Sequence, residues 1–64
     1  MKVKITMERN AFPSRKSNAV ARINRDLGSK ASVSGDTITV DEGSDERKVI
    51  DILNREGINY SRSK

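Results

Sequence analysis

The sequence predicts an α+β fold, a two-layer sandwich in which two helices cover one face of an antiparallel sheet. Residues 1–8 alternate between apolar and polar side chains, as a half-buried strand does. Residues 15–27 and 45–56 carry apolar side chains at the spacing of one helix face. Residues 31–40 hold two short alternating runs on either side of Gly35 and Asp36, which is typical of a tight hairpin.

The first strand is expected to bury every second side chain. Its two faces are Met1, Val3, Ile5 and Met7 on one side, and Lys2, Lys4, Thr6 and Glu8 on the other. Because only one face is apolar, the sheet should cover the core with that face and leave the other open to solvent.

The first helix is expected over residues 15–27. Phe12 precedes a proline, which favours an extended backbone, so the helix should begin after it with Ser14 as the N-cap. Gly28 supplies the stop signal. The apolar residues of this helix are Ala19, Val20, Ile23 and Leu27.

The hairpin after this helix has a register that follows from its loop. If Gly35 and Asp36 are the two loop residues, the facing pairs are Ser34 with Thr37, Val33 with Ile38, and Ala31 with Val40. This register places every apolar side chain of the hairpin on one face.

The second helix has the clearest boundaries. We expect Ser44 as its N-cap, with Asp45 and Glu46 in the first turn, where the helix dipole favours negative charge. Gly57 ends it. The last residues, 58–62, either form a fourth strand, with Ile58 and Tyr60 inward, or a frayed tail whose end, residues 61–64, is disordered.

With the last strand, the element order is the β-α-β-β-α-β order of a ferredoxin-like arrangement, in a single domain of residues 1–64. This layout resembles the heavy-metal-associated domain, which carries a Cys-x-x-Cys pair between its first strand and first helix. The corresponding loop here, residues 8–17, has no Cys, so a copper-carrier role is not supported. The layout also resembles the RNA-recognition motif, which displays aromatic residues on its central strands. The outward positions here are Lys2, Lys4, Thr6, Thr37 and Thr39, so bases are not expected to stack on this sheet.

The composition excludes several kinds of chemistry. The chain of 64 residues has no Cys and no His, so it has no disulfide, thiol nucleophile, imidazole base or usual zinc site. The acidic run lacks the spacing of a calcium loop and is interpreted as an acidic helix start; its members are Asp41, Glu42, Asp45 and Glu46. We therefore expect a non-enzymatic protein without cofactor or metal. No apolar run has membrane-spanning length, and we expect a cytoplasmic location.

Positive charge is concentrated in the first half of the chain. The net charge is +4, with +6 on residues 1–32 and −2 on residues 33–64. Positions i, i+3, i+7 and i+10 of the first helix form one stripe of polar and basic side chains, and Lys16 adds a cation where this helix begins. Asp26 is expected to pair with Arg22, four residues earlier. The candidate nucleic-acid-binding residues are Arg15, Lys16, Asn18, Arg22 and Arg25.

These features favour a small basic module that contacts the phosphates of DNA or RNA through the first helix and the loop before it. The other interpretation of the stripe is an ordinary solvated helix face, with the stem of Lys16 lying over the edge of the core. The alternative function is a regulatory, adaptor or inhibitor protein that binds an acidic protein surface through its open sheet, an edge strand or Phe12. For Phe12 we also expect a structural role, in which it closes one end of the core. A homodimer formed by two open sheets or edges is a further alternative.

Overall fold

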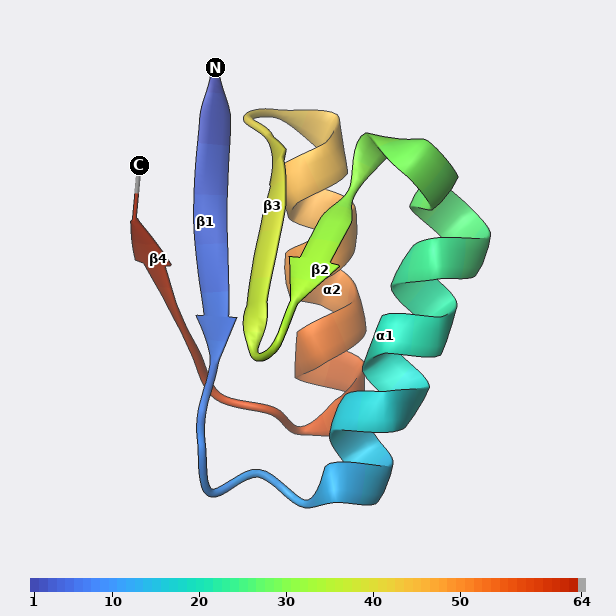
Figure 1. The fold of residues 1–64 in the computed structure, drawn as a ribbon, viewed down its shortest axis with the longest axis vertical. Coiled ribbons are helices and arrows are strands. Elements are labelled where there is room, and N and C mark those ends of the chain that lie inside the picture. The colour runs from blue at the N-terminus through green and yellow to red at the C-terminus, as the bar shows by residue number, and fades with distance from the viewer. Residues whose placement is uncertain (64) are drawn as a thin grey trace.

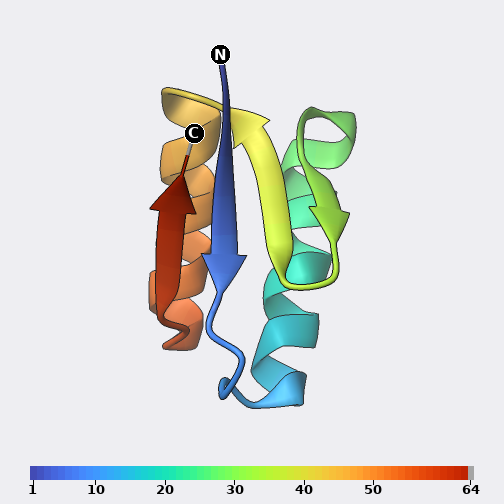
Figure 2. The ribbon, with the colours of Figure 1, turned by 60° about the vertical axis from the view of Figure 1, so that its left-hand side comes forward.

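A computed structural model of the protein describes residues 1–63 and confirms the α+β class. A four-stranded antiparallel sheet forms one layer, and both helices pack against the same face of it (Figures 1 and 2). In chain order the elements are β1 (Lys2–Met7), α1 (Pro13–Leu27), the 3-10 helix η1 (Gly28–Lys30), β2 (Ser32–Ser34), β3 (Thr37–Asp41), α2 (Ser44–Glu56) and β4 (Tyr60–Ser63).

The strand order across the sheet is β2-β3-β1-β4, and each neighbouring pair is antiparallel. Each helix therefore joins two strands that a third strand separates. Helix α1 connects β1 to β2 across β3, and α2 connects β3 to β4 across β1. The two helices run in opposite directions, so the start of α1 lies beside the end of α2 (Figure 1).

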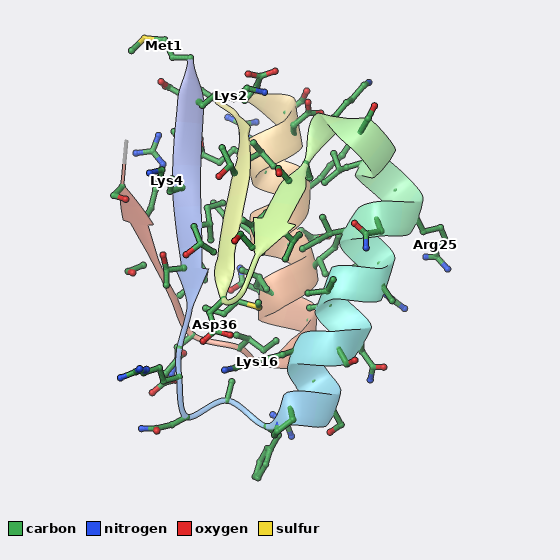
Figure 3. The ribbon with its side chains drawn as sticks, viewed as in Figure 1. Met1, Lys2, Lys4, Lys16, Arg25 and Asp36 are labelled. Carbon is green, nitrogen blue, oxygen red and sulfur yellow. The ribbon has the colours of Figure 1, made fainter. Side chains whose placement is uncertain are left out.

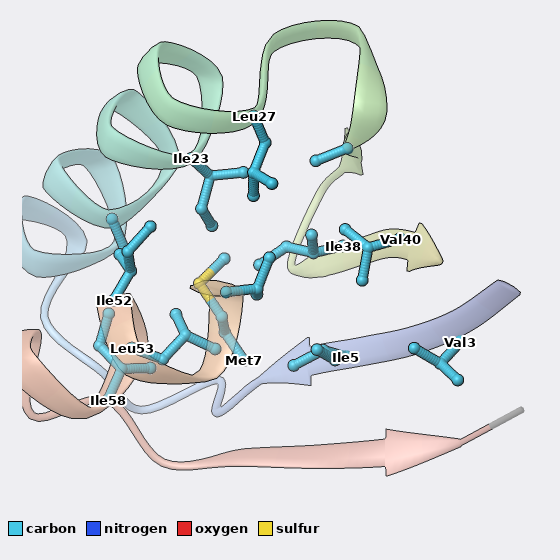
Figure 4. Packing of buried hydrophobic residues seen from close by; sticks show 13 residues of the cluster. Val3, Ile5, Met7, Ile23, Leu27, Ile38, Val40, Ile52, Leu53 and Ile58 are labelled. Atoms are coloured by element: carbon cyan, nitrogen blue, oxygen red, sulfur yellow. The ribbon is translucent and has the colours of Figure 1, made fainter. Parts of the chain in front are cut away.

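The core lies between the sheet and the two helices (Figure 4). On β1 the inward side chains Val3, Ile5 and Met7 are at most 2% exposed, and residues 2–7 alternate as predicted. Met1, also placed on the buried face by the prediction, lies before the first residue of β1 and is 88% exposed. Full burial of an aliphatic side chain of this size contributes about 1.5–3 kcal/mol to folding. The buried side chains of the core cluster are Val3, Ile5, Met7, Ala19, Ile23, Leu27, Ala31, Ile38, Val40, Val49, Ile52, Leu53 and Ile58.

The hairpin between β2 and β3 has the predicted loop. Gly35 has a φ of 59°, while Asp36 does not have a positive φ, which matches a type II′ turn. Val33 faces Ile38 and Ser34 faces Thr37, as expected. The ladder ends at Ser32, so the predicted pair of Ala31 with Val40 lies just outside it.

Both predicted N-caps are displaced by one or two residues. Helix α1 begins at Pro13 with Phe12 as the N-cap, not Ser14, because the fixed φ and missing N–H of proline suit the first helical position. Helix α2 begins at Ser44 itself, and Gly43 is the N-cap with a φ of 106°, a conformation that favours glycine. Neither cap uses a side-chain hydrogen bond.

The C-terminal segment forms the fourth strand. Ile58 is 2% exposed and enters the core, and β4 then pairs with β1 from Tyr60 opposite Met7 to Ser63 opposite Lys4. Arg62 forms an ion pair with Glu46 that fastens β4 to α2, and this hydrogen bond raises the pKa of Arg62 above its ordinary value. Residues 61–63 thus lie in β4, whereas Lys64, also placed in the tail by the prediction, lies outside the described residues.

Within residues 1–63, neither helix combines the length and the apolar character needed to cross a membrane.

The end of α2 gives a test of the fold. Gly57 has a φ of 71° and its N–H donates to the carbonyl of Asn54, while the N–H of Ile58 donates to the carbonyl of Leu53. These two bonds form a Schellman motif, which needs a left-handed residue at Gly57. We expect Gly57→Ala to lower the free energy of unfolding by about 1–2 kcal/mol in urea denaturation, because alanine is strained in this conformation.

Gly57→Asn is the matched control, because asparagine adopts the left-handed conformation more readily than alanine. It should cost less than Gly57→Ala. Equal stability of the alanine variant and the wild type would contradict the assigned motif.

Candidate functional site

The outer side of α1 carries the predicted row of polar and basic side chains. We call Arg15, Asn18, Arg22 and Arg25 the basic stripe. All four are exposed, whereas Ala19, Ile23 and Leu27 of the same helix are buried. The stripe covers about 15 Å along the helix axis at 1.5 Å per residue. The side chain of Arg25 points away from the rest of the molecule (Figure 3).

Two arginines of the basic stripe have no carboxylate partner among the described residues. Within residues 1–63, Arg15 and Arg22 have no Asp or Glu oxygen within 4.0 Å, and Arg25 pairs with Asp26 at 3.2 Å. The predicted pair of Arg22 with Asp26 is therefore wrong. An acid placed C-terminal to its cation is the weaker orientation on a helix, and the exposed neighbour Arg25 takes Asp26 instead. The other paired cations are Lys2 with Asp41, Lys16 with Asp36, Arg55 with Asp51, and Arg62 with Glu46 and Glu42.

Lys16 lies apart from the basic stripe. Its ammonium group is 3.2 Å from the Asp36 carboxylate in the β2–β3 loop, and it donates to the carbonyl of Arg9 at 3.2 Å. The Lys16 side chain is only 18% exposed. Figure 3 shows it beside Asp36. The position of Lys16 could be predicted from the sequence. Ile23 and Leu27 follow Lys16 by 7 and 11 residues, which places Lys16 on the same side of the helix as these two buried residues. Lys16 therefore connects the hairpin loop and the loop before α1 to the first turn of the helix.

Phe12 does not close the core, contrary to its expected structural role. Phe12 is 64% exposed, and Tyr60 packs partly against the core. Met7 and Ile58 are buried in the core (Figure 4). The guanidinium carbon of Arg15 lies 5.4 Å from the centre of the Phe12 ring, which is the range of a cation–π contact. This contact is not among the expectations from the sequence, because it depends on Phe12 turning outward.

Arg15 also lies close to the end of α2. A side-chain carbon added at Gly57 would be 3.0 Å from Nη1 of Arg15. The C-terminal end of a helix carries partial negative charge, so this position stabilises the arginine side chain at the junction of the two helices. Arg15 is thus both exposed and held between Phe12 and α2.

The open face of the sheet is polar. Lys4 lies on central strand β1 beside Thr39 of β3 and Ser63 of β4, and Thr6 contacts Thr37 with 3.5 Å between the hydroxyl oxygens. A shallow depression of about 260 Å³ at the β1–β4 end is lined by Thr6, Met7, Glu8, Asn59, Tyr60 and Ser61. The exposed large hydrophobic residues of the described chain are Met1 and Phe12, so this face carries no large exposed apolar side chain.

Three of the four acids in the acidic run have partners on neighbouring strands. Asp41 pairs with Lys2, and Glu42 and Glu46 pair with Arg62. In the part of the chain from residue 1 to residue 63, no three Asp or Glu side chains gather into a group that could hold a metal ion. Asp41 thus connects the end of β3 to β1, and Glu42 and Glu46 connect the loop before α2 and α2 itself to β4.

Comparison of the chain with protein families, curated proteins and solved structures finds no match.

The Lys16–Asp36 contact predicts an energetic coupling that the basic stripe should not show. Lys16→Met and Asp36→Asn should each lower the free energy of unfolding, and the double variant should lose less than the sum of the two. Because the pair is only partly buried, the expected coupling is about 0.5–1 kcal/mol in a urea double-mutant cycle. Arg22→Met, which has no ion pair to lose, is the control and should leave stability unchanged. Strict additivity of Lys16→Met and Asp36→Asn would contradict the assigned contact.

Proposed function

We propose that the protein binds the phosphate backbone of DNA or RNA through the basic stripe, with little preference for base sequence. One observation carries this proposal. Arg15 and Arg22 are exposed and have no carboxylate partner among residues 1–63, on a helix whose one acid, Asp26, pairs with Arg25. A stripe with unneutralised guanidinium groups favours an anionic ligand with repeated charges.

The chemistry of the stripe suits phosphate oxygens. Arginine donates two parallel hydrogen bonds to a phosphate, and the Asn18 amide can donate one between the two arginines. Contacts of this kind give a dissociation constant on the order of 10⁻⁴–10⁻⁶ M at physiological salt, because they read charge and not sequence. Lys16 is left out of this interface, since Asp36 and the Arg9 carbonyl already occupy its ammonium group.

We also infer that the fold belongs to the ferredoxin-like class. The support is the order β2-β3-β1-β4, in which each helix joins two strands separated by a third.

Protein docking through the sheet has less support. A docking surface for a protein is expected to have an apolar centre, and the open face carries hydroxyl groups and lysines instead. The outer strand β2 is three residues long, which gives a partner strand little to pair with.

The proposal predicts a specific loss of binding in the variant Arg15→Glu with Arg22→Glu. Binding to DNA and RNA oligonucleotides is measured by fluorescence anisotropy at several salt concentrations. We expect a loss on the order of tenfold or more at low salt. The slope of log K against log[salt] should become shallower by about 1.4–1.8, as two phosphate contacts are lost.

The matched control is Arg47→Glu with Lys48→Glu on α2, which changes the total charge by the same amount. Both residues are exposed and have no carboxylate within 4.0 Å in residues 1–63. Melting curves confirm that both variants fold. An equal loss in the two variants would show a general effect of net charge, and unchanged binding in the α1 variant would rule out the basic stripe.

A further inference from the structure

Phe12 is an exposed aromatic side chain that stands alone. It is 64% exposed, and the other exposed large hydrophobic residue within residues 1–63, Met1, lies at the opposite end of the molecule from the start of α1 (Figure 3). Within residues 1–63 Phe12 therefore has no second large exposed hydrophobic side chain beside it, whereas a protein-docking surface would need a broader apolar patch. The neighbour of the ring is instead a cation of the basic stripe.

The ring is attached to a fixed backbone. Phe12 is the N-cap of α1, and its carbonyl accepts hydrogen bonds from the N–H groups of Arg15 at 3.0 Å and Lys16 at 3.1 Å. The next residue, Pro13, has a φ angle restricted by its own ring. Only the two side-chain torsions of Phe12 remain free, so a ligand that stacks on the ring restricts little further motion.

Phe12 and Arg15 together present two planar groups. The guanidinium carbon lies 5.4 Å from the ring centre, so Arg15 lies over the phenyl ring. Aromatic rings and guanidinium planes are the two protein groups on which unpaired bases stack, and this stacking tolerates any base. The pair stands where the basic stripe begins, because Arg15 belongs to both.

The geometry points to Phe12 as a stacking residue for an unpaired base, and so to single-stranded nucleic acid as the ligand of the basic stripe. This inference rests on the proposed function, since the stripe would hold phosphates of the strand whose base meets Phe12. Arg15 and Arg22 are about 10 Å apart along the helix. In a duplex the bases are stacked on one another and are hidden from the ring.

The first test measures affinity for two ligands of the same sequence, a single-stranded DNA of about 12 nucleotides and its duplex. Phe12→Leu keeps an apolar side chain but removes the aromatic face. Phe12→Trp replaces the phenyl ring by a larger aromatic ring system. For Phe12→Leu we expect single-strand affinity to fall on the order of tenfold while duplex affinity stays within about twofold. Phe12→Trp should bind the single strand at least as tightly as the wild type. All variants should keep the wild-type melting temperature, because the side chain lies outside the core.

A second readout does not depend on affinity. Phe12 is the only Phe in the chain, so its ring signals in an NMR spectrum belong to one residue. Stacking on a base should move these signals upfield when the single strand is added, and the duplex should not produce this shift.

The outcomes separate the two proposals. Unchanged single-strand affinity of Phe12→Leu, or an equal loss for the duplex, overturns the stacking role. If Arg15→Glu with Arg22→Glu weakens both ligands while Phe12→Leu affects neither, the proposed function stands and the stacking role fails. If the wild type binds neither ligand at low salt, the proposed function fails and the stacking role fails with it.

Discussion

Burial of one face of β1 is the constraint on which the rest of this structure depends. The strand lies at the centre of the sheet, between β3 and β4, and its inward side chains Val3, Ile5 and Met7 belong to the same buried cluster as residues of both helices. Side chains alternate across a strand, so the residues between them must face solvent. The same constraint turns Ala19, Ile23 and Leu27 inward on α1 and leaves Arg15, Asn18 and Arg22 outside. The basic stripe thus follows from how the core is closed.

The ion pairs add a second constraint, because they decide which charges remain available. Asp36 accepts Lys16, Asp41 accepts Lys2, and Glu46 accepts Arg62. Each of these pairs connects different secondary-structure elements or the loops beside them. The acidic excess of residues 33–64 is in this way partly used to hold the fold together, and the positive charge of α1 is reduced at Lys16 but not at Arg15 or Arg22. This distribution separates structural cations from those offered to a ligand.

Much of the fold could be predicted from the sequence, because periodic burial leaves a local pattern. The alternation of residues 1–8, the Gly35-Asp36 loop and the ends of both helices at Gly28 and Gly57 are all local signals, and the structure contains each of them. The predicted N-caps are wrong, although Ser14 and Ser44 are favoured cap residues. The backbone preferences of Pro13 and Gly43 determine where the two helices begin.

The candidate site could be predicted only in part. The spacing of the basic stripe is local to one helix and is visible in the sequence. The partner of Lys16, Asp36, lies 20 residues away in the hairpin loop, and no local pattern predicts this contact. The outward position of Phe12 is likewise a matter of tertiary packing, because Phe12 is not among the residues that form the buried cluster. The sequence therefore predicts the basic stripe. It does not predict the contact of Lys16 with Asp36 or that Phe12 lies beside the stripe.

We propose that α1, and not the open sheet, contacts an anionic polymer. An NMR titration of labelled protein with a short single-stranded oligonucleotide, at low and then at raised salt, tests it most directly. We expect signal shifts at residues 12–25, including the side-chain N–H signals of Arg15 and Arg22, that are reversed by salt. Shifts confined to the sheet, at Lys4, Thr37 and Thr39, would contradict it.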